Sequence, residues 1–361
     1  MASAALLEEL VPQVKRNCDI SDAHFWGYHS TCGLLLRLRE LYRSERGLRP
    51  WHRIETAEIA RWIGEREALW KELEDADFSP LAVGGRRFAA FDAPGLNEAL
   101  RPEGLLYGAG YGAFGKPVFF VARLEGRETL EGREVLLAGK EFARDISLHP
   151  AMLQDGVIFA RKEVAELLVW EKFEEYAAGR SRGLLGAAFG FYGIGRSASG
   201  AEAEEKVRQV ADDEVRAYIY HEVGEAVEGE RLGPGWAGML GEVLSSRASA
   251  YLRAVKDVLA DTSDKGMLRH IIRNRNSGAL AFYMAFLSGM RRTLSEGVVE
   301  AHGRFMADGL WEAVERARAE CYERTLKSAG ELMEAFGRGG PEALLDDIGE
   351  RMKGPRGSAP P

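Results

Sequence analysis

The sequence has few cysteines, no long apolar run and no excess of positive charge, and each shortage excludes a class of protein. Three cysteines among 361 residues are too few and too scattered for a disulfide framework. No uninterrupted apolar run reaches the roughly 18 residues that a membrane-spanning helix requires. The formal net charge of −8 argues against bulk electrostatic binding to nucleic acid, although it is compatible with a local basic patch.

The rest of the composition is that of an ordinary globular protein. Hydrophobic residues make up 46% of the chain and charged residues 29%, and 361 residues suffice for two or three domains with cores of their own. The first residues, MASAALLEELVPQVKR, predict an amphipathic helix with early acids and lack the pattern of a signal peptide. We therefore expect a soluble, cytoplasmic protein with reduced cysteines.

Hydrophobic periodicity divides the chain into four regions and predicts a predominantly α-helical α+β fold. Residues 1–81 have the pattern of three amphipathic helices. Residues 82–161 lose that pattern and gain glycine and aromatic residues, which indicates a small antiparallel β insert. Residues 162–353 return to helical spacing as a C-terminal bundle, and the sequence GPRGSAPP at 354–361 is typical of a disordered tail.

The β insert is expected to contain five strands and one short helix. The predicted strands are Arg86–Phe91, Leu105–Tyr107, Val118–Leu124, Glu134–Ala138 and Val157–Ala160, and the predicted helix is Pro94–Leu100.

The glycine-rich segment 107–117, YGAGYGAFGKP, has the outline of two nucleotide-binding motifs, and both fail. A P-loop needs Ser or Thr where Pro117 stands, and it needs a helix where the strand-like VFFVARL follows. The kinase-type glycine loop lacks its companion motifs. The alternative is a hairpin with Tyr107, Tyr111 and Phe114 exposed, so we expect the loop at 107–115 to be one candidate partner surface.

A second candidate surface is GLLGAAFGFYGIG at 183–195, which is uncharged and has arginines on both sides. It is too short to span a membrane. A mobile lid, a shallow membrane contact and a partner-binding segment are all compatible with its composition, as is a buried connector.

The most informative stretch is DDEVRAYIYHEVGEAVEGE, where ionisable residues recur at helical spacing beside an apolar face. Glu214, Tyr218, His221 and Glu225 are separated by four, three and four residues, so they share one stripe of a helix. Glu222 is expected near the middle of the apolar face, where a carboxylate is unfavourable unless it is paired or bound to a cation.

Imidazole and carboxylate side chains suit a Zn, Fe or Mn site, so we expect a helical protein that binds a divalent metal ion or a small molecule here. The HEVGE spelling differs from the zinc-protease motif at its second histidine, and no second copy supports a di-iron bundle. Glu222 is the candidate catalytic acid, and Tyr218 would support the ligands. The candidate metal ligands are His221, Glu225, Glu214 and His270, with His302 as the alternative histidine from another helix.

Two other interpretations stay open. The stripe is also compatible with a solvated helix face that pairs with the arginines at 269–275 and holds no ligand. The whole chain is compatible with a non-catalytic interaction or scaffold protein. Whether it is an enzyme is therefore left open.

Three segments occur in this order: GLLYGAGYGAFGKPVFFVARLEG (104–126), AGKEFARD (138–145) and YHEVGEA (220–226). In this combination the chain resembles an uncharacterised family of bacterial proteins with no assigned activity. The resemblance implies a bacterial cytosolic protein, and it implies no substrate, cofactor or catalytic residue.

Overall fold

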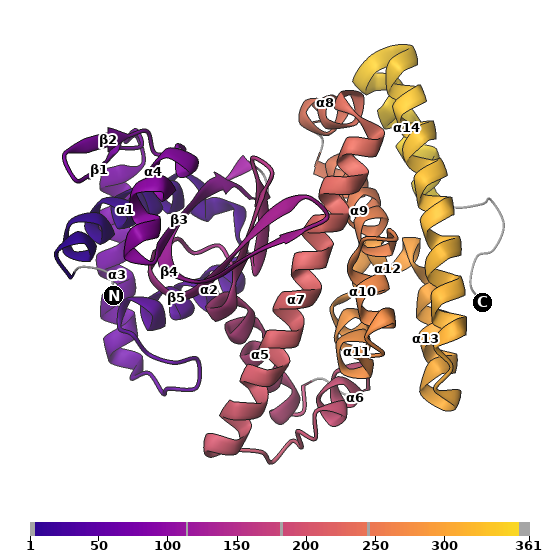
Figure 1. Ribbon diagram of the computed structural model, residues 1–361, viewed down its shortest axis with the longest axis horizontal. Helices are drawn as coiled ribbons and strands as arrows, with labels where there is room; N and C mark the ends of the chain where they lie inside the picture. The colour runs from indigo at the N-terminus through magenta and orange to yellow at the C-terminus, as the bar shows by residue number, and fades with distance from the viewer. Residues whose placement is uncertain (1–3, 113–114, 181–182, 244–245, 354–361) are drawn as a thin grey trace. The chain divides into compact units, whose positions relative to one another are not determined.

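The computed structural model describes residues 4–112, 115–180, 183–243 and 246–353. Three helices form the N-terminal region, as the sequence predicts: α1 (Ala4–Phe25), α2 (Thr31–Glu45) and α3 (Thr56–Leu73) (Figure 1). Helix α2 begins after Ser30, whose hydroxyl accepts a hydrogen bond from the backbone N–H of Gly33. This cap satisfies an N–H that has no partner inside the helix.

Two sheets follow. Strands β1 (Leu81–Val83) and β2 (Arg86–Phe88) form an antiparallel pair, and a curled five-stranded sheet has the order β3-β4-β5-β7-β6. The five strands are β3 (Leu105–Tyr111), β4 (Pro117–Leu130), β5 (Arg133–Arg144), β6 (Ala151–Gln154) and β7 (Val157–Arg161). All neighbours pair antiparallel except β5 and β7, because β6 takes the edge and β7 returns between it and β5. Strands β1 and β6 were not predicted from the sequence.

Both faces of the five-stranded sheet are buried. On one face Leu105, Tyr107 and Phe119 pack in a core with Val14 of α1 and with α4 (Ala93–Leu100). Residues at the alternate positions form a second core, which includes Leu106, Val118, Phe120, Ala122, Leu136, Met152 and Phe159. Successive strand residues point to opposite faces, so the unbroken apolar run in β4 supplies both cores.

The expected exposure of the aromatic residues at 107–115 is wrong for Tyr107. Strand β3 extends beyond the predicted end, so Tyr107 lies in mid-strand, is fully buried, and donates a hydrogen bond of 2.6 Å from its hydroxyl to the carbonyl of Ala90. The side-chain amide of Asn97 bonds both the N–H and the carbonyl of Tyr107, each at 2.8 Å. Tyr111 is exposed, and Phe114 lies outside the described residues.

The rest of the described chain is helical, as the sequence predicts, and it includes two helices that were not predicted individually, Leu184–Phe191 and Glu296–Asp308. The helices are α5 (Lys162–Ala177), α6 (Leu184–Phe191), α7 (Gly200–Leu232), α8 (Pro234–Glu242), α9 (Ser246–Thr262), α10 (Met267–Arg273), α11 (Ser277–Phe286), α12 (Gly289–Leu294), α13 (Glu296–Asp308) and α14 (Trp311–Lys353). The tail predicted at 354–361 lies outside the described residues.

The segment 265–292, predicted as one long helix, is divided into α10, α11 and α12. The first break occurs at Arg275, which has a φ of 50°, and the Asn276 side chain then caps α11 by accepting from the N–H of Ala279. A similar break at Gly309, with a φ of 72°, separates α13 from α14. These breaks turn the chain so that short helices pack on one another.

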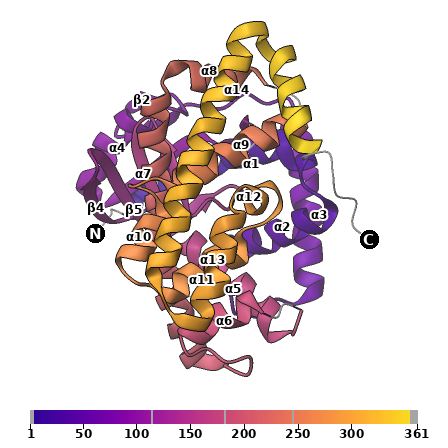
Figure 2. The same ribbon diagram turned by 90° about the vertical axis from the view of Figure 1, so that its right-hand side faces the viewer.

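The chain forms two compact units. The first consists of residues 1–180 and 196–215, and the second of residues 181–195 and 216–361. In the second unit α9 packs against α10, α12 and α14 (Figures 1 and 2). Helix α6 packs against α11, where Phe189 meets Phe282 edge-on with ring centroids 5.0 Å apart. Much of the 183–195 stretch is therefore internal packing, although Phe191 is exposed.

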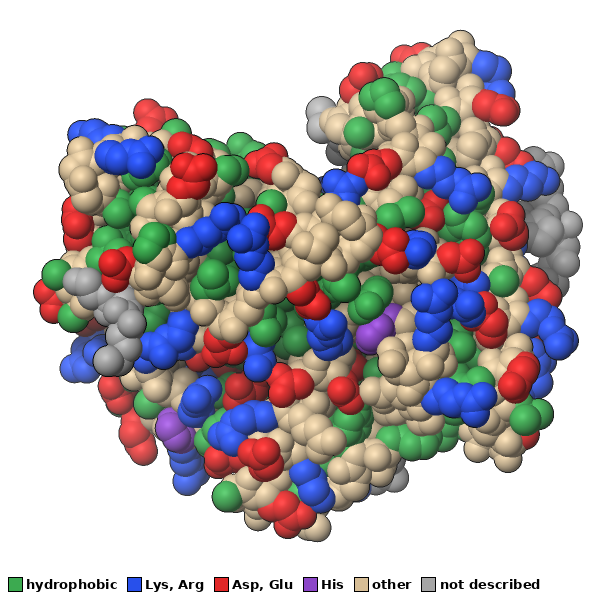
Figure 3. All heavy atoms as spheres, in the orientation of Figure 1, with side chains coloured by type: hydrophobic (Ala, Val, Ile, Leu, Met, Phe, Trp, Pro, Cys, Tyr) green, Lys and Arg blue, Asp and Glu red, His purple; other side chains and the backbone are tan. Residues whose placement is uncertain are grey.

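Charges of both signs mix on the surface. On the face drawn in Figure 3, Lys and Arg side chains of the described residues are interspersed with Asp and Glu. Within the described ranges, no helix combines the length and the apolar character needed to cross a lipid bilayer.

Candidate metal centre

Helix α7 carries two of the predicted ligands in the second unit, His221 and Glu225. They lie one helical turn apart, and Nε2 of His221 is 3.6 Å from Oε2 of Glu225. Both side chains are partly buried. Their apolar neighbours Ile219 and Val223 are fully buried, so the helix presents this pair at the edge of its packed face.

A glycine between the two ligands brings α7 close to α9. A Cβ atom built on Gly224 would lie 2.3 Å from the carbonyl oxygen of Ala260, and one on Gly266 would lie 1.9 Å from the same oxygen. Real Cβ atoms do not approach backbone so closely, so both positions require glycine at this spacing. The close approach sets the side chains of α7 against those of α9.

Helix α9 contributes two carboxylates one turn apart, Asp257 and Asp261. Asp261 is fully buried, and its Oδ1 lies 2.6 Å from Nδ1 of His221. Its other oxygen, Oδ2, accepts a 2.7 Å hydrogen bond from Nη2 of Arg291 in α12. Asp261 therefore holds the imidazole ring from one side and leaves Nε2 facing Glu225.

His221, Glu225 and Asp257 form a group that could hold a cation. Each offers one ligand atom, and these three atoms lie within 4.8 Å of one another. Ligand atoms around a four-coordinate zinc ion are about 3.3 Å apart. The separation of 3.6 Å between Nε2 of His221 and Oε2 of Glu225 is close to that value. A histidine whose other nitrogen bonds a carboxylate is the usual arrangement of a metal-binding imidazole.

In the absence of a cation, the charged side chains of the cluster shift one another's pKa values. Burial alone would lower the pKa of His221, but the charge of Asp261 and the hydrogen bond to it raise that pKa to about 10. Burial would raise the pKa of Glu225, and the ammonium of Lys256, which donates a hydrogen bond to it, lowers that pKa instead. Burial raises the pKa of Asp257. The cluster is thus an ion-paired network in which a cation would replace the proton of His221 and the ammonium of Lys256.

The other predicted site residues lie outside this three-residue group. Glu222 is partly exposed instead of buried. Glu214 is buried in the first unit, one of its oxygens has no hydrogen-bond partner, and burial raises its pKa well above the usual value. His270 stacks on Tyr220 with ring centroids 4.0 Å apart. His302 is buried, and burial lowers its pKa. The three-residue group that could hold a cation among the described residues contains none of these four.

Two family models match the chain. The N-terminal domain of a family of unknown function (DUF6866) matches residues 9–161, and the C-terminal domain of the same family matches residues 166–354. The chain belongs to this family. The expectation of an uncharacterised family is confirmed. The comparisons with curated proteins and with solved structures found no match.

The DUF6866 C-terminal match includes every residue of the cluster. The two α7 residues of the cluster were predicted from the sequence, and its other members were not: Lys256, Asp257, Asp261 and Arg291. One signal was available: the sequence KDVLAD places two aspartates four residues apart, the same spacing as His221 and Glu225. A second histidine was expected from another helix, whereas α9 supplies carboxylates.

Proposed function

We propose that the second unit binds one divalent metal ion through His221, Glu225 and Asp257. The observation that carries this proposal is the group of three ligand atoms within 4.8 Å of one another, with the imidazole oriented by Asp261. One nitrogen and two carboxylate oxygens suit Zn, Fe or Mn. We therefore propose a helical metal-binding protein, in which any catalytic reaction would take place at the metal ion.

Glu222 is the residue that we propose for proton transfer beside the metal. Its charge contributes to the raised pKa of His221, and its partial exposure leaves it accessible to water. If a metal ion were bound, this carboxylate would be able to accept a proton from water beside it. Glu222→Gln should then retain the metal, whereas Glu225→Gln should lose it. Loss of metal from Glu222→Gln would instead make Glu222 a ligand.

The test is metal analysis of the purified chain after chelator treatment and reloading with Zn, Fe or Mn in separate samples. We expect about one bound ion per chain for the wild type with at least one of these metals. The His221→Ala/Glu225→Ala double variant should bind none. Glu230→Ala is the matched control, because Glu230 is an exposed acid on the same helix. A wild-type chain that stays metal-free in all three samples would exclude the proposal.

Partner binding is the second candidate function, and the exposure of Tyr111 and Phe191 favours it. Deletion of 183–195 would remove internal packing, so Phe191→Ser is the cleaner change. Co-purification from native lysate should capture a partner with the wild type and not with that variant. A wild type that elutes alone at monomer size would count against this candidate. We also propose a cytoplasmic location, in keeping with three free cysteines.

A further inference from the structure

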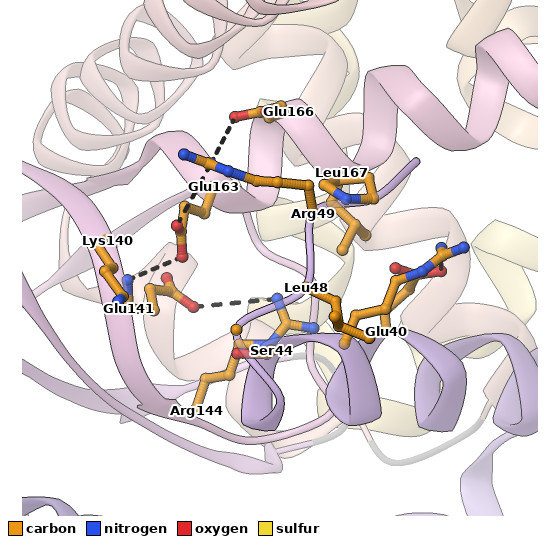
Figure 4. A pocket seen from close by; sticks show the side chains of 13 residues that line it. Glu40, Ser44, Leu48, Arg49, Lys140, Glu141, Arg144, Glu163, Glu166 and Leu167 are labelled. Atoms are coloured by element: carbon orange, nitrogen blue, oxygen red, sulfur yellow. Dashed lines mark hydrogen bonds and ion pairs between the residues drawn. The ribbon is translucent and has the colours of Figure 1, made fainter. Parts of the chain in front are cut away.

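A cavity in the first unit has a buried guanidinium in its wall. The cavity has a volume of about 220 Å³ and lies between α2, the segment 47–50, β5 and α5. Figure 4 shows Arg144 at the end of β5, with its guanidinium pointing toward Ser44 and Leu48. A cavity of about 150 Å³ is large enough for benzene, so this one is large enough for a small metabolite.

The guanidinium of Arg144 lacks the partners that a buried charge requires. Arg144 is only 5% exposed, and its Nε and Nη2 atoms have no hydrogen-bond partner. The carboxylate of Glu141 is the acid that contacts it, at 4.0 Å from Nη1. A buried charge without a partner is strongly unfavourable, so an unsatisfied guanidinium in a cavity wall favours an anionic ligand.

Glu141 cannot neutralise Arg144, because Arg161 already holds it. The Nε and Nη2 atoms of Arg161 donate to the two oxygens of Glu141 at 2.6 and 2.9 Å. One buried carboxylate thus faces two buried guanidinium groups, and one positive charge remains. The Nε and Nη2 atoms of Arg144 are buried and lack hydrogen-bond partners, whereas the same two atoms of Arg161 bind a carboxylate. A guanidinium binds a carboxylate or a phosphate with two parallel hydrogen bonds, and Arg144 lines the cavity.

The other acids of the cavity are also engaged. One oxygen of Glu40 accepts from Arg39 at 2.5 Å and from Arg43 at 2.7 Å. Glu163 accepts the backbone N–H of Glu141, and burial raises the pKa of its carboxyl. Burial also lowers the pKa of Arg144, as expected for a cation that has too little negative charge around it.

We propose that this cavity binds a small-molecule anion, through a carboxylate or phosphate group held by Arg144. One oxygen of a residue in the wall, Oε2 of Glu40, has no hydrogen-bond partner, whereas Oε1 of Glu166 lies 3.8 Å from Nε of Arg208. The Glu40 oxygen suits a ligand that also carries a hydroxyl group, because such a group donates while the anionic group accepts. This site lies in the first unit and does not depend on the metal centre proposed for the second.

Titration calorimetry of the full chain with two probes tests the proposal. Inorganic phosphate and L-malate distinguish a phosphate ligand from a carboxylate ligand, and glycerol is the neutral hydroxyl control. We expect saturable binding of at least one anion and none of glycerol. Failure of both anions to bind the wild type at concentrations up to about 10 mM, beyond the millimolar affinity expected of a small ligand, would overturn the proposal.

Two variants assign the binding to Arg144. Arg144→Met removes the charge and Arg144→Lys keeps it without the two-pronged edge, so each should weaken binding of the anion by at least about tenfold. Arg87→Met is the matched control, because Arg87 is an exposed arginine of the same unit, and it should bind as the wild type does. A purely structural Arg144 would lower the melting temperature when replaced by Met, whereas a ligand-binding one should leave it unchanged or raise it. Wild-type affinity in both Arg144 variants would also overturn the proposal.

Discussion

The contact between α7 and α9 depends on Gly224, and Gly224→Ala tests that dependence. The added Cβ would meet the carbonyl oxygen of Ala260 at 2.3 Å, whereas ordinary Cβ contacts lie at 3.4–4 Å. The obstacle is backbone, which cannot rotate away as a side chain can. The two helices must therefore separate by about 1 Å, against the resistance of a close-packed interior.

Two opposing effects set the change in the free energy of unfolding that Gly224→Ala causes. Alanine is favoured over glycine inside a helix by about 1 kcal/mol. Overpacking a well-packed contact destabilises by about 1–3 kcal/mol, and a clash with backbone belongs in the upper part of that range. We therefore expect Gly224→Ala to lower the free energy of unfolding by about 1–2 kcal/mol, which is about 2–4 °C in melting temperature for each kcal/mol. The separation should also lengthen the 2.6 Å contact between His221 and Asp261.

The assay is urea unfolding followed by far-UV circular dichroism, with unchanged m-values as the sign that only stability has changed. Gly229→Ala is the control on the same helix, because nothing lies within 4 Å of a Cβ built there. It should stabilise the protein by up to about 1 kcal/mol. If Gly224→Ala is as stable as Gly229→Ala, the glycine contact does not position the cluster.

Two further predictions concern the first unit. Asn97→Ala leaves the buried N–H and carbonyl of Tyr107 without their side-chain partners, so we expect a loss of about 2–4 kcal/mol in urea unfolding, and no loss would contradict the bridging role. Burial lowers the pKa of His149 from its ordinary 6.5 to about 4, so the unfolded chain binds this proton more readily than the folded one. Stability should therefore fall as the pH drops from about 6.5 to about 4, by about 1–2 kcal/mol once partial exposure is allowed for. His149→Gln should remove this part of the pH dependence, and equal slopes for variant and wild type would refute the assignment.

Much of the fold could be predicted because helices and strands follow local patterns. The three N-terminal helices, α4, α5 and the position of α7 all come from periodicity and turn residues. The predictions of secondary structure that were wrong have physical causes as well. Strand β6 has four residues, too few for a reliable pattern, and the single helix expected at 265–292 is interrupted at Arg275, whose backbone conformation no helical pattern reveals.

The candidate metal site could also be predicted only in part. The spacing of His221 and Glu225 determines by itself that they share one face of a helix, because a helical turn is a local property. Their partners on α9 lie 30 to 40 residues away, and only the glycine-mediated approach at Ala260 selects Asp257 and Asp261 over the predicted histidines.

The cavity of the first unit depends still more on tertiary structure. The sequence shows that Glu141, Arg144 and Arg161 carry charge, but it does not show which of them pair. The parallel pairing of β5 with β7 places Arg161 beside Ala138, so that it holds Glu141 and leaves Arg144 unsatisfied. The sequence alone determined which side chains can carry charge and on which elements they lie. Packing decided which of those charges were neutralised, because ion pairs form between residues that only the folded chain brings together.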